Sequence, residues 1–342
     1  MIRKVQAYEA IPSFQLLPPA PKTSTRTPLC PVRKEEIVQT LKTTIFTASV
    51  AAMLLACAAI ASANPFPAVV VYGDSLSDNG NLYAATLPIT GGTPPSPPYY
   101  LGRYSNGPVA VEQLASLLGS PPLYDFAWAG ATTGVGNIGD GGTQTTSGAL
   151  KLPGMLAELA AFHPPAALVP TSLFVVWGGA DDFEIGGSVS VAVGNIDAIV
   201  ASLQAAGATH ILVPGLPDLG LTPEFMGDAA ATLYSEQFNQ GLLATLPAGA
   251  TYFDTFGLLD SIVADPGAYG FTNVTQACLT TTSVCTDPGQ YLFWDDIHPT
   301  TDADAILAEQ FEFAVVPEPS SILLLGTGIA GVAGFLRRRR AA

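Results

Sequence analysis

Residues 69–81 read VVVYGDSLSDNGN, and this stretch decides the fold. It opens with four β-branched or aromatic residues before Gly73, a composition typical of a short strand buried on both faces inside a parallel sheet. A polar turn follows, which can open a helix and hold one side chain above the carboxyl end of the strand. Open α/β sheets carry their chemistry at that edge. We therefore expect a functional group in this turn, and the candidate is Ser75.

Ser75 could be a nucleophile, a helix cap or an ordinary turn residue, because Gly-Asp-Ser occurs by chance and serine is a favoured cap. A hydroxyl is a weak nucleophile until a base takes its proton, so a nucleophilic serine requires a histidine and an orienting acid. The chain has three histidines. His163 and His210 have apolar or helical surroundings, which favours packed or surface histidines. His298 lies in LFWDDIHPT, three residues after Asp295.

Together these motifs resemble the GDSL esterase/lipase family, the SGNH hydrolases. Residues 73–76 read GDSL and residues 295–298 read DDIH. Four inner segments resemble family segments in the family's order: GRYSNGPVAVEQLA at 102–115, DFAWAGATT at 125–133, VPGLPDLGLTP at 213–223 and YGFTNVTQACL at 269–279. The resemblance covers nearly all of residues 68–313. Agreements in order are far more specific than a single tripeptide, so they favour a nucleophilic serine.

The resemblance implies a secreted serine esterase or lipase that hydrolyses carboxylic esters through an acyl-enzyme intermediate. Ser75 would be the nucleophile, His298 the base and Asp295 the acid that orients the imidazole. Asp296 is a competing orienter, but the family pattern and the spacing favour Asp295. The neighbouring Asp74 and Asp78 are expected to fix the nucleophile turn by accepting backbone hydrogen bonds.

The family's oxyanion hole implies three donors: the backbone N–H of Ser75, the backbone N–H of Gly130 and a side-chain amide. Where the family reads Gly-x-Asn-Asp, residues 179–182 read GADD, so Asp181 replaces the amide. An ionised carboxylate would repel an oxyanion, whereas a protonated one can donate. Three alternatives follow: Asp181 is a protonated donor, it points away, or activity is lost. We hypothesise that Asp181→Asn raises the rate at neutral pH.

The body of the chain alternates strand and helix, which predicts a parallel sheet covered on both faces. The resemblance implies the same fold, a three-layer α/β/α sandwich with flavodoxin-like strand order. Residues 88–100 and 132–148 are expected to be long loops that shape a pocket or a lid. Further strands are expected at 123–128, 173–177, 210–214 and 251–253, and helices at 109–118, 155–162, 189–206, 229–246 and 301–313.

Residues 1–63 are expected to be a leader and signal peptide. Seven of the thirteen basic residues lie before residue 43, an apolar run spans 45–61, and A-x-A at 61–63 predicts cleavage after Ala63. The basic region is long for a signal peptide, so translation starts later than Met1 or the leader is extended. Residues 54–57 (LLAC) also resemble a lipoprotein cleavage box, but apolar residues continue past Cys57.

Residues 316–342 resemble a PEP-CTERM sorting signal of Gram-negative bacteria. The motif VPEP precedes an apolar run at 322–336 and four arginines at 337–340. The resemblance implies transient membrane retention, cleavage by an exosortase and release at the cell surface or outside the cell. The apolar run is just long enough to span a bilayer, so a plain C-terminal anchor is the alternative.

Residues 64–315 form one domain by size and are strongly acidic. Their only basic residues are Arg103 and Lys151, against twenty-four Asp and Glu. This charge excludes nucleic acid as a partner and disfavours anionic lipid surfaces. Cys278 and Cys285 remain as an even pair after export, and we expect them to form a disulfide. No cofactor and no metal site is expected.

Two functions of different classes remain open at this point. The first is an esterase acting on short acyl esters, lipids or acylated polysaccharide. The second is a catalytically weak surface or matrix protein that binds glycans on a hydrolase fold. The sorting signal and Asp181 favour the second a little, whereas Ser75, Asp295 and His298 favour the first more strongly. Aromatic side chains near the motifs, such as Tyr99 and Trp294, could line an acyl pocket or pack in the core.

Overall fold

The computed structural model describes residues 65–316 and Gly331. The expected signal peptide, the lipoprotein box and the apolar run at 322–336 lie outside the described residues, apart from Gly331. The strands are β1 (Val69–Gly73), β2 (Leu123–Asp125), β3 (Leu173–Trp177), β4 (His210–Pro214), β5 (Ala250–Phe253), β6 (Asn273–Ala277) and β7 (Tyr291–Phe293). The α-helices are α2 (Asn81–Thr90), α3 (Ala110–Leu117), α4 (Met155–Ala161), α5 (Ala180–Glu184), α6 (Val189–Ala205), α7 (Ala229–Thr245), α8 (Thr255–Ala264) and α9 (Thr301–Val315). Short 3₁₀ turns occur at Ile138–Asp140, Ala166–Leu168, Leu219–Leu221, Pro266–Tyr269 and Pro288–Gln290.

The main sheet has the strand order β2-β1-β3-β4-β5, and all of its strands are parallel. This is the flavodoxin-like order, which places β1 and β3 side by side at its centre. Val69 pairs with Leu123 on one side and with Leu173 on the other. All five residues of β1 are buried, as the apolar run predicts. Both the parallel sheet and the strand order are thus confirmed.

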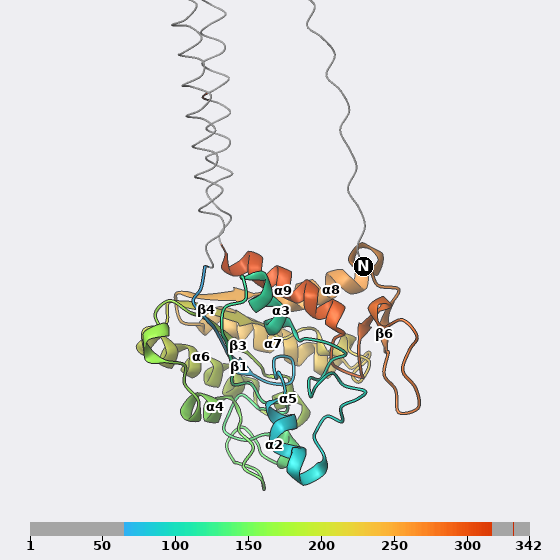
Figure 1. Cartoon of the computed structure of the whole chain (residues 1–342), viewed down its shortest axis with the longest axis horizontal. Coiled ribbons are helices and arrows are strands. Elements are labelled where there is room, and N and C mark those ends of the chain that lie inside the picture. Colours follow the sequence, from blue (N-terminus) through green and yellow to red (C-terminus); the bar gives the residue numbers. More distant parts are fainter. Residues whose placement is uncertain (1–64, 317–330, 332–342) are drawn as a thin grey trace, which may run out of the picture. The chain divides into compact units, whose positions relative to one another are not determined.

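Helices cover both faces of this sheet and complete the α/β/α sandwich (Figure 1). Val70 and Tyr72 of β1 point to one face, where they pack in a cluster with residues of α4, α6 and α7. Val69 and Val71 point to the other face and pack with residues of α3 and α9. Successive side chains of a strand alternate between faces, so a strand covered on both sides must be apolar throughout.

A second, smaller sheet lies beside the sandwich and leads into the segment that carries Asp295 and His298. It pairs β6 with β7 and packs with α8 and the start of α9 in a third cluster that includes Leu259, Phe271 and Leu292. The chain passes from β7 directly into residues 294–298. The main-chain N–H of Trp294 donates to the carbonyl of His298 at 2.7 Å, which closes this segment into a tight turn.

The structure differs from the sequence expectations in a few elements. The second strand was expected to reach residue 128 but ends at Asp125. Residues 88–90 were expected to be loop, yet they form the last turn of α2, where Pro88 gives up a single backbone hydrogen bond. Gly91 then ends the helix in the left-handed conformation (φ 88°). Sequence patterns missed α5, α8 and the small sheet. Among the described residues, no helix is long and apolar enough to cross a membrane.

Candidate active site

Ser75 lies immediately after β1, at the carboxyl edge of the main sheet. The carboxylate of Asp74 accepts the main-chain N–H of Leu76 at 3.0 Å, which holds the turn around the serine. Asp78 is fully buried and accepts N–H groups from residues 80, 81 and 82 and from Ala129. It therefore ties the serine turn to the neighbouring loop that contains Gly130. Both aspartates bind backbone amides, as the sequence predicts.

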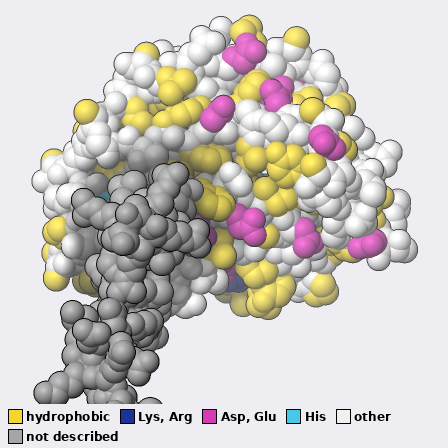
Figure 2. Space-filling model, turned by 90° about the horizontal axis from the view of Figure 1, so that it is seen from above, with side chains coloured by type: hydrophobic (Ala, Val, Ile, Leu, Met, Phe, Trp, Pro, Cys, Tyr) yellow, Lys and Arg dark blue, Asp and Glu magenta, His cyan; other side chains and the backbone are white. Residues whose placement is uncertain are grey.

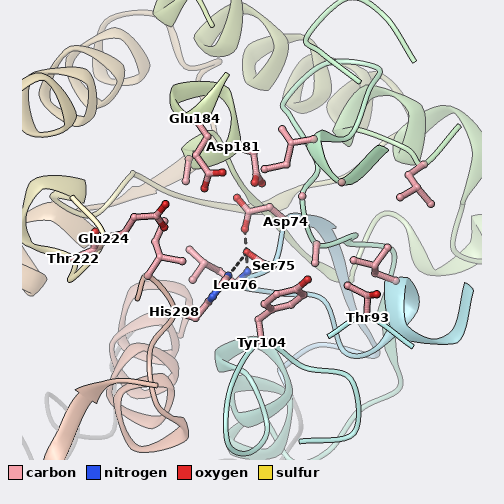
Figure 3. A pocket seen from close by; sticks show the side chains of 18 of the residues that line it. Asp74, Ser75, Leu76, Thr93, Tyr104, Asp181, Glu184, Thr222, Glu224 and His298 are labelled. Carbon is pink, nitrogen blue, oxygen red and sulfur yellow. Dashed lines mark hydrogen bonds between the residues drawn. The ribbon is translucent and has the colours of Figure 1, made fainter. Parts of the chain in front are cut away.

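His298 lies within hydrogen-bonding distance of both Ser75 and Asp295, and Figure 3 shows it beside Ser75. Its Nε2 is 2.8 Å from the serine Oγ. Its Nδ1 is 2.9 Å and 2.8 Å from the two carboxylate oxygens of Asp295. With the proton on Nδ1, the ring donates to Asp295, and its Nε2 accepts the serine O–H. The structure thus brings together three residues that the sequence separates by up to 223 positions.

The surroundings of Asp295 keep it ionised. Burial alone would raise the pKa of this carboxyl, but the charge of His298 and the hydrogen bonds to it lower the pKa to about 2. Its oxygens accept the N–H groups of Ile297 and His298 and the hydroxyl of Tyr99, the last at 2.8 Å. Burial lowers the pKa of His298, yet Asp295 outweighs it and the net shift is upward. This carboxylate therefore favours the imidazolium form.

The alternative orienter, Asp296, points elsewhere. It is exposed, and its part in the described hydrogen bonds is through its carbonyl, which accepts the N–H of Glu224 at 2.7 Å. Asp295, and not Asp296, is therefore the carboxylate that contacts the imidazole of His298.

Ser75 and His298 open into a cavity of about 420 Å³ that Gly130 and Asp181 also line. Gly130 has φ 82°, and a Cβ there would come within 2.6 Å of the Asn137 side-chain oxygen, so only glycine fits. Within residues 65–316, the N–H groups of Ser75 and Gly130 donate no hydrogen bond to protein. Both of these donors remain available for a ligand.

Asp181 lies on the short helix α5 and is 6% exposed. Its Oδ2 has no hydrogen-bond partner among the described residues. Burial, and then the charge of Asp74, raise the pKa of this carboxyl well above its usual range. The raised pKa favours the neutral carboxyl, which carries an O–H that can donate.

Sequence reasoning missed several residues around the site. The ring of Tyr104 packs against the imidazole of His298, with 4.7 Å between centroids. Glu184 and Glu224 line the cavity. Each belongs to a different segment, so no local pattern could have grouped them. The aromatic residues considered for an acyl pocket, Tyr99 and Trp294 among them, do not line the cavity; Tyr99 binds Asp295 instead.

Cys278 and Cys285 are joined by a disulfide that closes a loop at the edge of the small sheet. The N–H of Leu279, next to Cys278, donates to the carbonyl of Trp294 at 2.6 Å. The bridged loop thus lies against the segment that carries Asp295 and His298.

Comparison with known proteins identifies similar chains. A GDSL esterase/lipase of Arabidopsis thaliana is 28% identical, over 71% of this chain and 87% of the relative. A phosphatidylcholine-sterol acyltransferase of Aeromonas hydrophila is 30% identical, over 62% of this chain and 65% of the relative. Among solved structures, the acetylxylan esterase Axe2 of Geobacillus stearothermophilus gives a TM-score of 0.42 at 13% identity, over 73% of this chain and 94% of that one.

Two family models match the chain in succession. The PEP-CTERM protein-sorting motif matches residues 315–340, which confirms the expected sorting signal and indicates export to the cell surface of a Gram-negative bacterium. The GDSL-like Lipase/Acylhydrolase model matches residues 69–311, which is more than half of the chain. The protein therefore belongs to the GDSL-like lipase/acylhydrolase family of serine ester hydrolases.

Proposed function

We propose that this protein hydrolyses carboxylic esters by nucleophilic attack of Ser75, with His298 as general base and acid and Asp295 as the residue that orients it. The observation that carries the proposal is the 2.8 Å contact from His298 Nε2 to Ser75 Oγ, with Asp295 on the opposite nitrogen at 2.8 Å. A serine hydroxyl needs a base at this distance to become nucleophilic.

In the first half-reaction, Oγ of Ser75 attacks the ester carbonyl while His298 takes its proton. The imidazolium then gives this proton to the leaving alkoxide, and the acyl group stays on the serine. In the second half-reaction, His298 takes a proton from water, which attacks the acyl-enzyme. The imidazolium then returns this proton to Oγ of Ser75 as the acid leaves. Asp295 stays ionised throughout and stabilises the imidazolium.

The oxyanion would be bound by the N–H groups of Ser75 and Gly130 and by the O–H of a neutral Asp181. Their positions around one cavity support this assignment. A protonated carboxyl replaces the amide of other family members without adding a negative charge. This is the first of the three alternatives for Asp181, and its raised pKa supports it.

We also propose how the two ends of the protein are processed. Residues 1–63 would direct export, residues 64–315 would form the hydrolase domain, and residues 316–342 would be the sorting signal. The apolar run at 322–336 would hold the protein in the membrane transiently, until an exosortase cleaves near the motif. The enzyme would then act at or outside the cell surface on short acyl esters, lipids or acylated polysaccharide.

A fluorophosphonate probe tests the proposal, because it reacts with activated serines. The purified protein should be labelled with a rate that rises through the histidine range between pH 5 and 9, and Ser75→Ala should abolish both labelling and hydrolysis of a chromogenic ester. A folded protein that stays unlabelled at every pH would contradict the proposal. The glycan-binding alternative would then be tested next, by binding to immobilised polysaccharide.

A further inference from the structure

The cavity at Ser75 has two arms that differ in charge. One arm lies between α2 and the loop that contains Ile138, and its side chains are apolar or hydroxyl-bearing. The other arm carries acidic side chains from α5 and from the loop after β4, among apolar side chains that include Pro217, Leu219 and Ile297. Figure 3 shows Thr93, from the first arm, and Glu224, from the second, on opposite sides of Ser75. The first arm includes Leu82, Ile138, Leu150 and Leu152, and the second Asp181, Glu184 and Glu224.

Two carboxylates of the acidic arm are held by the packing of their neighbours. Glu184 follows Phe183 in the chain, and Glu224 precedes Phe225. The two phenyl rings pack edge to face, with 5.2 Å between centroids and an interplanar angle of 83°. The main-chain bond from Glu224 to the carbonyl of Asp296 ties the same loop to the segment that carries the histidine. This packing fixes the main chain at the two glutamates, whose side chains are exposed at the mouth of the arm.

Within residues 65–316, no lysine or arginine lines the acidic arm, and His298 is the one basic side chain among the residues that line the cavity. The arginine and the lysine of this range are Arg103 and Lys151, and neither lines the cavity. Arg103 is paired with Glu112 at 2.7 Å. On the face that Figure 2 draws, acidic side chains stand among hydrophobic and neutral ones with very little basic surface near them. Burial, followed by the charge of Glu224, raises the pKa of Glu184, whereas the charge of His298 lowers it.

A second observation indicates that a ligand belongs in the cavity beside this arm. Asp181, which is more than nine-tenths buried, lines the cavity and has a carboxyl oxygen without a partner among the described residues. A buried polar atom without a partner costs about 1–3 kcal/mol unless something binds it.

The position of His298 decides which part of an ester each arm receives. The histidine must deliver its proton to the leaving alkoxide, so the alcohol has to leave on the side of the imidazole. In Figure 3, His298 and Glu224 lie on the same side of Ser75. The alcohol then enters the acidic arm, and the acyl chain enters the apolar arm against α2.

We propose that the preferred substrates are esters of positively charged alcohols, with the cation bound between Glu184 and Glu224 and the acyl chain placed beside Leu82 and Ile138. The proposal rests on the proposed ester hydrolysis at Ser75. An ester whose alcohol carries an anion would be excluded by the same carboxylates.

Three esters that share one acyl group test the proposal. They are butyrylcholine, its uncharged isostere 3,3-dimethylbutyl butyrate, and the butyrate ester of 2-hydroxyethanesulfonate. The released acid is titrated at constant pH 7.5 to give kcat/KM for the purified protein at low and high salt. We expect roughly a tenfold preference for the choline ester over its isostere, which shrinks as salt screens the arm, and a further loss for the sulfonate ester.

Variants that remove one charge each test whether the two glutamates cause the preference for the choline ester. Glu184→Gln and Glu224→Gln should each lower the ratio of choline ester to isostere, and the double variant should bring it close to one. The matched control is Glu309→Gln, an exposed residue of α9 outside the cavity, which should leave the ratio and both rates unchanged. A merely structural effect of the glutamates would lower all three rates together and keep the ratio.

Equal rates for the choline ester and its isostere, or a preference for the sulfonate ester, would overturn the inference and leave the proposed ester hydrolysis standing. Absence of hydrolysis of all three esters by a folded protein, with Ser75 unlabelled by the fluorophosphonate, would overturn the proposed function and this inference with it.

Discussion

Both carboxylate oxygens of Asp295 lie within 2.9 Å of Nδ1 of His298. A carboxylate in this position fixes the tautomer in which Nε2 can accept the serine proton. Asp295→Asn keeps the shape of the side chain but removes its charge, and it allows the amide to select the opposite tautomer. We expect kcat to fall about 10³- to 10⁴-fold, with the melting temperature little changed.

The adjacent residue provides a matched control. Asp296→Asn makes the same chemical change at an exposed side chain and should keep kcat within about twofold, because surface charges this weakly coupled have small effects. Steady-state kinetics on one chromogenic ester measures both variants. If the two aspartates exchanged these phenotypes, the assignment of the orienting acid would be wrong.

Asp181 predicts a distinctive response to pH. Its raised pKa favours the neutral carboxyl, which can donate, and this donor is lost as pH rises through the folded pKa. An amide donates at every pH. Asp181→Asn should therefore match or exceed the kcat of the natural enzyme at pH 7, and the difference should widen toward pH 9.

Removal of the donor distinguishes a role in the oxyanion hole from a passive one. Asp181→Ala should lower kcat about 10²- to 10³-fold, the usual cost of one oxyanion donor. Profiles of kcat against pH for the three proteins provide the measurement. A lower kcat for Asp181→Asn in a folded protein would refute the neutral-donor assignment.

Asp304 links stability to pH. It is 1% exposed, and burial raises its pKa well above the usual range. The hydroxyl of Ser105 lies 3.1 Å from Asp304 and 3.0 Å from the carbonyl of Pro299, but it has only one proton. A neutral Asp304 can donate to this hydroxyl, which then donates to the carbonyl, so both contacts are satisfied. The neutral form therefore fits the fold.

The sign of this effect follows from the raised pKa. The stabilisation from Asp304 is fully present below the pKa of the unfolded chain, about 3.9, and is lost as pH rises through the folded pKa, by up to about 1.4 kcal/mol per pH unit. Asp304→Asn donates at all pH values. Calorimetry should show that the melting temperature of this variant, relative to that of the natural protein, rises between pH 5 and pH 8. The same difference for Glu309→Gln should show no such trend. A constant difference would contradict the assignment.

The disulfide should contribute to stability more than to catalysis. It links residues only seven positions apart, and closing so short a loop in the unfolded chain stabilises the fold by about 2 kcal/mol. The paired variant Cys278→Ser with Cys285→Ser should therefore melt several degrees lower and keep most of its kcat at 25 °C. A large loss of kcat at that temperature would mean that the bridged loop positions Asp295 and His298.

The sequence predicted the elements whose side chains are uniformly buried. β3 and β4 were predicted with their observed limits, because a strand covered on both faces is a continuous apolar run. The small sheet was missed because one residue of β6, Val274, is buried and its neighbours are polar. Helix α2 was not among the expected helices, and its last three residues were assigned to a loop because of Pro88, although a last helical turn tolerates proline.

The site shows the same division between local and spatial information. Ser75, Asp295 and His298 were found because their motifs are local in the sequence. Glu184 and Glu224 were not found, because they come from separate segments and converge only through the packing of two phenylalanines. A charged residue on a loop resembles any solvated side chain until the fold places it in a cavity.

The nucleophile and its base belong to different sheets. Ser75 extends from β1 of the main sheet, whereas His298 follows β7 of the small sheet, whose apolar cluster with α8 is separate from the two clusters of the sandwich. Folded proteins open in parts, and a small unit with its own cluster can detach at a lower free energy than global unfolding. Detachment of this unit would break the contact between His298 and Ser75 while β1–β5 stayed paired. Catalytic activity would then act as a reporter of local unfolding: it should decline on heating, reversibly, before the backbone amides of the main sheet lose their protection from hydrogen exchange.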